Sequence, residues 1–307
     1  MPAPSTPPSD PTRERTGLLL AVVAVALFSL KVVVVKLGLA DGLTVETLMA
    51  WRMLLSVPVY VAVGVVAFRR ADAVAAPRSL VAAAALGVHS YYVCTWLDFT
   101  GMRYISAQLE RLVLFTYPAL TAVLAWAILG ERFTRRHAAS LGLSYAGVLL
   151  VFGAEAGHAG PHTALGVGLV FAAALLFAGY VVLAKPVIAA LGSQRFTCVA
   201  MTAATAAILA HQLVRTTSTP AEAAADWITP AALAYGAVLA VVCTVAPSFM
   251  LSEAIARIGA GRASAAGNLG PVVTALAAVV VLDEPFGPAQ AGGLVLIVVG
   301  VGLLAKK

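Results

Sequence analysis

The chain has 307 residues, of which 61% are hydrophobic and only 11% are charged, and its mean hydropathy is +0.95. An ordinary soluble domain carries about 25% charged residues, so this composition excludes a soluble globular protein and also a disordered chain. The excess of 20 Lys and Arg over 14 Asp and Glu is spread thinly, which argues against a nucleic-acid partner. Since one crossing of a bilayer takes about 20 apolar residues, the length allows about ten transmembrane helices.

Ten apolar runs, broken by charged residues, glycine or proline, predict an all-α polytopic membrane protein. The predicted helices lie near residues 17–37, 44–67, 79–99, 104–128, 137–155, 164–184, 195–214, 230–252, 259–282 and 288–305. Helices are expected rather than strands because the backbone of each segment in lipid must satisfy its own hydrogen bonds. Residues 1–16, rich in Pro and Ser, are expected to form a disordered cytoplasmic tail.

The charges beside the predicted helices indicate the orientation of the chain. Arg13 and Arg15 precede the first run as in a signal peptide, but the run continues past Lys31 with no obvious small-residue cleavage site, which predicts a retained helix. With the amino terminus inside, the cytoplasmic segments hold fourteen Lys and Arg, whereas the opposite segments hold only Arg103 and Arg215. Because Lys and Arg are retained on the cytoplasmic side, both termini are predicted to lie in the cytoplasm. The expected location of the chain is a bacterial inner membrane.

The sequence contains an internal repeat. Shifted by 153 places, residues 103–151 align with 256–304, and LGERF at 129–133 matches LDEPF at 282–286. The glutamate of each motif lies thirteen residues after a proline. These matches, with a weaker one between the starts of the two halves, predict two five-helix repeats at 17–155 and 156–307.

Five is an odd number of crossings, so the second repeat must be inverted relative to the first. Two nearly equivalent inverted halves can open a central site alternately to each side, as many secondary transporters do. The repeat therefore favours a carrier.

The first and the sixth predicted helix each have a Lys near their end. The fourth helix ends with the pattern RYISA…P…LGE, and the ninth ends with the pattern RIGAGRAS…P…LDEP. With this doubled pattern, residues 17–305 resemble the EamA-type family of the drug/metabolite transporter superfamily. The resemblance implies ten helices, cytoplasmic termini and export or exchange of a small-molecule substrate, such as an amino acid, an amine or a related compound. It also implies a cavity lined mainly by the first four and the sixth to ninth helices, with the fifth and tenth at the periphery, where they could support a homodimer.

Ionisable side chains at membrane depth are costly unless they are paired or hydrated, so each is a functional candidate. The substrate-binding or coupling candidates in the first half are Lys31, Arg52, His89, Tyr92, Glu110 and Arg111. Glu110 is the first choice for proton coupling or substrate binding, with Lys31 or Arg52 as its expected partner. A structural salt bridge between the first, second and fourth helices is the alternative. Asp98, near the end of its helix, is interpreted as an interfacial cap.

The second half contributes fewer candidates. Ser264 and Asn268 are the uncharged polar groups in a run of small residues and could face the cavity. Pro118 and Pro271 each remove a helical hydrogen bond and are hinge candidates, although a fixed bend is equally consistent. Glu131 and Glu284 are expected to stabilise helix ends rather than to contact substrate.

The same chain carries little that suggests catalysis. His158 and His162 have a metal-ligand spacing, but Gly160 and Pro161 break the helix between them and no third ligand follows, so no metal and no cofactor are expected. Without a Walker A motif, direct coupling to ATP within this chain is excluded. A passive channel is the alternative to a carrier, and an intramembrane enzyme is a weaker one.

Overall fold

A computed structural model describes residues 11–70, 75–130, 132, 134–155, 160–220 and 226–305. All regular secondary structure in this part of the chain is helical, which confirms the predicted all-α class. Eight helical segments of 20–29 residues are long and apolar enough to cross a membrane. Two shorter apolar helices, Gly267–Leu282 and Pro288–Leu303, complete the ten that the sequence predicts.

The first half is built from helices that group into five crossings. In chain order they are α1 (Pro11–Ala40), α2 (Val45–Arg69), α3 (Pro77–Gly87), the π-helical turn η1 (Val88–Cys94), α4 (Thr95–Gly101), α5 (Ala107–Leu114), α6 (Tyr117–Leu129) and α7 (Arg135–Glu155). The first helix starts six residues before its predicted start, because proline is well suited to the first helical position and the charged residues after it continue the helix. Residues 1–10 of the predicted tail lie outside the described residues.

The second half follows the same plan. Its helices are α8 (Thr163–Leu191), α9 (Ser193–Ser218), α11 (Pro230–Ala237), the π-helical turn η2 (Val238–Val245), α12 (Ala246–Ala266), the 3₁₀ turn η3 (Gly267–Leu269), α13 (Gly270–Leu282) and α14 (Pro288–Ala305). The predicted start of the ninth helix at 259 is wrong, because α12 continues through Gly259 and Gly261 to Ala266. A glycine costs a helix only about 1 kcal/mol relative to alanine, so two glycines do not suffice to end it.

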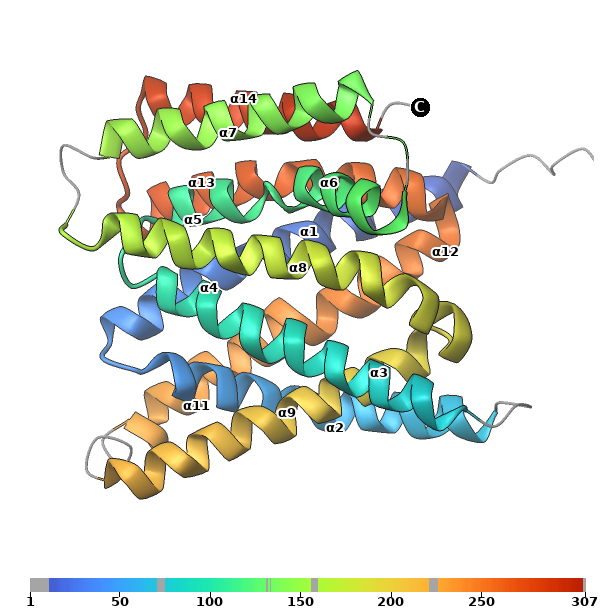
Figure 1. The fold of residues 1–307 in the computed structure, drawn as a ribbon. Coiled ribbons are helices and arrows are strands. Elements are labelled where there is room, and N and C mark those ends of the chain that lie inside the picture. The colour runs from blue at the N-terminus through green and yellow to red at the C-terminus, as the bar shows by residue number, and fades with distance from the viewer. Residues whose placement is uncertain are drawn as a thin grey trace, which may run out of the picture.

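The connections between crossings alternate between two ends of the bundle (Figure 1). The start of α1 and the end of α14 lie at one end, while α8, the first helix of the second repeat, starts at the other. We call the first end the basic end, after Arg69, Arg70, Arg132, Arg135 and Arg195. We call the other the acidic end, after Asp41, Asp226, Asp283 and Glu284. The two repeats are therefore inverted, and α7 and α14 lie side by side at one edge of the molecule (Figure 1).

Corresponding interruptions occur in both halves. The π-helical turns η1 and η2 begin 150 residues apart, at Val88 and Val238. Pro118 and Pro271 each lie in the first turn of a new helix, directly after a break in the crossing. Proline lacks the amide hydrogen and collides with the carbonyl four residues earlier, so the preceding helix ends before it. The α-helix is thus interrupted directly before both hinge candidates.

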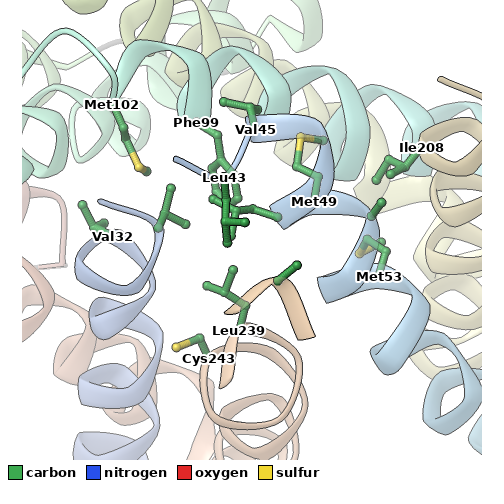
Figure 2. Packing of buried hydrophobic residues seen from close by; sticks show 14 of the residues in the cluster. Val32, Leu43, Val45, Met49, Met53, Phe99, Met102, Ile208, Leu239 and Cys243 are labelled. Atoms are coloured by element: carbon green, nitrogen blue, oxygen red, sulfur yellow. The ribbon is translucent and has the colours of Figure 1, made fainter. Parts of the chain in front are cut away.

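The largest apolar cluster lies between the two halves. Figure 2 shows side chains of α2 and α4 packed with side chains of the second half. Met53 of α2 and Leu239 of η2 are fully buried in this cluster, and Phe99 of α4 is fully buried as well. Because these helices lie in lipid, the packing is stabilised by van der Waals contacts rather than by removal of apolar surface from water.

At the acidic end, Asp226 links the start of α2 to α9. It is 5% exposed and accepts hydrogen bonds from the backbone nitrogen (2.8 Å) and hydroxyl (2.6 Å) of Thr44, the N-cap of α2. Its other oxygen pairs with Arg215 at 3.0 Å. Burial alone would raise the pKa of Asp226, but the hydrogen bonds from Thr44, Arg215 and Thr47 outweigh it and hold this pKa below its ordinary value.

We expect Asp226→Asn to lower the free energy of unfolding by about 1–3 kcal/mol at pH 7, because charge-assisted hydrogen bonds are lost. A depressed pKa stabilises the folded state above the unfolded-state value of about 3.9, and this stabilisation is lost as the pH falls through the folded-state value. The gap between wild type and variant should therefore close below about pH 4, as measured by unfolding in detergent over a pH series.

The matched control is Asp283→Asn, because Asp283 is exposed at the same end of the molecule. Its φ of 53° is left-handed, a conformation that asparagine also accepts. A change within about 0.5 kcal/mol is expected there. Equal effects of the two variants, or a gap that persists at low pH, would contradict the anchoring role.

Candidate functional site

Five charged side chains of the first half point into the bundle: Lys31, Arg52, Asp98, Glu110 and Arg111. We call them the charged core. Lys31 Nζ lies 3.0 Å from Asp98 Oδ2, and the Asp98 side chain is only 5% exposed. The predicted pairing of Lys31 with Glu110, and the interpretation of Asp98 as an interfacial cap, are therefore wrong. The π-helical turn η1 precedes Asp98 and rotates all later residues of the helix, which a regular α-helical periodicity does not include.

Glu110 is completely buried near the start of α5. Within the described part of the chain, neither of its carboxyl oxygens makes a well-formed hydrogen bond, but the Asp98 carboxyl is close enough to share a proton with it. Asp98, Lys31 and Arg111 are the charged groups that act on it electrostatically. An ionised carboxylate without hydrogen bonds is very costly in an apolar interior, whereas a protonated one is neutral. With one proton on the two carboxyls, Lys31, Asp98 and Glu110 together carry no net charge, and the two arginines remain as the positive charges of the charged core.

The two arginines of the charged core have few partners. Arg52 is 6% exposed, its Nη2 lies 3.8 Å from Met53 Sδ, and its Nε has no partner among the described residues. Its guanidinium and the Lys31 ammonium lie 5.6 and 5.5 Å from the ring centre of Phe99. Cation–π contacts of this kind contribute about 2 kcal/mol when desolvated, but they do not replace a hydrogen-bond acceptor.

Arg111 connects the charged core to the second half. Its Nη2 lies 3.4 Å from Ser29 Oγ of α1, and a methyl group at Gly270 would lie 2.5 Å from the same nitrogen. The absence of a side chain at Gly270 is therefore what allows Arg111 to reach the start of α13, next to Pro271. Arg111 and Glu110 thus occupy a helix whose neighbours include both repeats.

The remaining sequence candidates lie outside the charged core. His89 Nε2 is bonded to the Leu176 carbonyl at 2.9 Å, and the Tyr92 hydroxyl lies 3.0 Å from His211 Nδ1. Asn268 lies in η3 and is half-buried. The side chain of Ser264 is outside the described part of the structure, so its role stays a prediction.

Sequence reasoning missed a row of aromatic side chains. Tyr117 and Phe177 have ring centres 5.0 Å apart, Phe177 and Tyr180 5.6 Å, and the hydroxyls of Tyr180 and Tyr91 are 3.4 Å apart. The row connects α6, α8 and η1. The spacing of three residues between Phe177 and Tyr180, which places both on one helix face, is the signal that could have found it.

The structure has a groove of about 720 Å³ at the basic end, between α2 and the connection of α8 to α9. Arg70 and Arg195 are among its lining residues, and none of the predicted site residues is. Among the described residues, no three His, Cys, Asp or Glu side chains are grouped to hold a metal ion. The charged core, rather than this groove, is therefore the candidate site.

We expect Lys31→Met and Asp98→Asn each to lower the free energy of unfolding by up to about 3–5 kcal/mol, because each leaves an uncompensated buried charge. The double variant should recover part of this loss, with a coupling energy of at least about 1 kcal/mol. A double-mutant cycle, followed by unfolding in detergent with increasing amounts of SDS, measures the coupling.

The exposed pair of Arg257 and Glu253 on α12 is the control, since its 2.7 Å contact is shorter than that of the buried pair. Its coupling energy should stay below about 0.5 kcal/mol after Arg257→Met and Glu253→Gln. Similar coupling at both pairs would show that burial does not make the Lys31 contact special.

The sequence and the fold of the chain are similar to those of known proteins. An uncharacterized transporter, YcbK of Bacillus subtilis (strain 168), is 28% identical over 301 residues, covering 93% of this chain and 92% of its own. An uncharacterized transporter, sll1319 of Synechocystis, is 27% identical over 208 residues, covering 68% and 61%. A crystal structure at 19% identity has the same fold, with a TM-score of 0.61 over 94% of this chain and 96% of its own.

The family model described as the EamA-like transporter family matches the chain twice, over residues 15–153 and 164–306. The two matches coincide with the inverted halves seen in the fold. The chain is an integral membrane protein that belongs to the EamA-like transporter family.

Proposed function

We propose that the protein is a secondary active carrier that exports or exchanges a small metabolite, such as an amino acid, an amine or a related compound, by alternating access. The observation that carries this proposal is the fully buried Glu110, whose carboxyl lies beside that of Asp98 and makes no well-formed hydrogen bond within the described part of the chain. It lies beside an ion pair, on a short helix that contacts α13 of the second half. Ionisable groups at membrane depth typically belong to substrate or proton pathways.

Glu110 is the proposed proton carrier. When the site faces one side of the membrane, the carboxyl binds a proton, and when it faces the other, it releases that proton. Lys31 and Asp98 stay paired throughout and keep the remaining charges balanced. An inward proton would then be exchanged for an outward metabolite.

Within this range of metabolites, we favour a substrate that carries a carboxylate, such as an amino acid, over a simple amine. Arg52 Nε and Arg111 Nε are buried donors without an acceptor among the described residues. A carboxylate is the group that a guanidinium binds best, through two parallel hydrogen bonds. Asp98 and Glu110 offset part of the positive charge, which favours a zwitterion over a simple anion.

The proposed location is a bacterial cytoplasmic membrane, with the basic end and both termini in the cytoplasm. Support comes from the charges of the two ends, because Lys and Arg beside short loops are retained in the cytoplasm. Homodimer formation through α7 and α14 stays a prediction from the family resemblance.

Untargeted metabolite profiling of a deletion strain and an overproducer tests the function. An exporter should shift one compound class in opposite directions inside and outside the cell. The identified compound is then loaded into proteoliposomes, where a carrier shows saturable exchange and a passive channel shows conductance without exchange. Conductance without exchange would overturn the carrier proposal.

We expect Glu110→Gln to keep exchange of the substrate but to lose its response to a pH gradient. Glutamine has nearly the same shape and cannot carry the proton. For one proton per substrate, a gradient of one pH unit should support about tenfold accumulation by the wild type and none by the variant. Proteoliposome uptake with and without the gradient measures this response.

Glu253→Gln removes an acid from an exposed ion pair on α12 and serves as the control. It should accumulate substrate like the wild type. An unchanged response to pH in Glu110→Gln would remove Glu110 from the coupling step and leave it a structural role.

A further inference from the structure

Glu284 of the second half holds the first turn of α5 in the first half. One carboxyl oxygen accepts a hydrogen bond from the Ala107 amide at 2.6 Å, and the other accepts one from the Gln108 amide at 3.2 Å. The Gln108 side chain donates to the Pro285 carbonyl at 3.1 Å. The LDEP motif at the end of α13 therefore binds the helix that carries Glu110.

A carboxylate is well suited to this place. The first amides of a helix have no partner inside the helix and carry partial positive charge, which an anion at the N-terminus stabilises. Ser106 Oγ accepts the Leu109 amide at 3.0 Å, so Ser106 and Glu284 together satisfy three successive amides. Two of these three bonds cross from one repeat to the other.

The helix α5 is a short unit with interruptions at both ends. It has eight residues, follows a turn at 102–106 and ends before a break at 115–116. Glu110 and Arg111 both lie within it. A displacement of its first turn would therefore move both charged groups relative to Lys31 and Asp98, which lie on α1 and α4.

The two ends of the inverted repeat differ at this contact. At a shift of 153, residues 102–106 correspond to 255–259, where α12 continues without a turn. Glu131, the counterpart of Glu284, lies outside the described residues. At the acidic end, α5 begins at the carboxylate of Glu284 from the other half. At the corresponding place in the second half, α12 continues and no new helix begins.

We propose that Glu284 is a positioning residue that latches the acidic end of the transporter closed. Its carboxylate holds α5, and with it Glu110 and Arg111, in the arrangement seen here, and it releases the Ala107 and Gln108 amides when the site opens to the acidic end. This inference rests on the proposed alternating access. It adds the group that sets the equilibrium between the state open to the acidic end and the state open to the basic end.

Cysteine accessibility tests the latch in the purified full chain. In a background in which Cys94, Cys198 and Cys243 are replaced by alanine, one reporter is Ile105→Cys, buried in the turn directly before α5. The other is Ala21→Cys, buried in the basic-end half of α1 next to α12. The rate of labelling by a hydrophilic maleimide reports how often each end opens.

Glu284→Gln should speed labelling at position 105 by roughly tenfold, the change expected when one charge-assisted hydrogen bond is lost, and should slow labelling at position 21. Asp283→Asn, which changes the neighbouring charge of the same motif, should alter neither rate. If Glu284→Gln does not fold, Gln108→Ala removes the contact with Pro285 and should shift both rates in the same directions by a smaller factor.

A merely structural role for Glu284 predicts faster labelling at both ends and a lower melting temperature, and that outcome, or unchanged rates, would overturn the latch. Failure of the proposed function is separate, because it would appear as an absence of saturable exchange in the wild type. The opposite changes in the two labelling rates do not depend on knowing the substrate.

Discussion

A bilayer provides no water to a buried charge, and the charged core therefore depends on the ion pair between Lys31 and Asp98. This pair neutralises two of its five charges at a distance of 3.0 Å. Glu110 is outside this pair, so it can take up or lose a proton while Lys31 and Asp98 continue to neutralise each other. The ion pair links α1 to α4, and α5, which carries Glu110, contacts both α1 and α13.

The inverted repeat is visible in the backbone more than in the side chains. The π-helical turns, the proline breaks and the left-handed residues that end α6 and α13, Gly130 and Asp283, recur at corresponding positions. Glu110 and Arg111 of the charged core do not recur, because they correspond to Ala263 and Ser264. The two halves therefore share the positions at which a helix is interrupted. The charged groups next to such an interruption, Glu110 and Arg111, belong to the first half. Such a division lets equivalent motions have unequal chemical consequences.

The sequence predicts the helices well because their signals are local. Apolar runs, prolines and the pattern of loop charges each act within a few residues, and the ten crossings follow from them. The partner of Lys31 could not be predicted, because η1 changes the face on which Asp98 lies and no local signal marks a π-helical turn. The contact of Glu284 with Ala107 spans 177 residues. It depends on how the two repeats dock, and the sequence shows only that a glutamate closes each motif.

The position of Glu110 one turn after the residues that Glu284 holds has a physical consequence. A short helix with breaks at both ends moves as a rigid body, so its two ends cannot be displaced independently. Protonation of Glu110 changes the electrostatic force between α5 and the Lys31–Asp98 pair, while the bonds to Glu284 change the force at the first turn. Both forces act on the same eight residues. Whatever loosens one contact therefore changes the free energy of the other, which is the coupling that a carrier needs between its bound proton and its closed end.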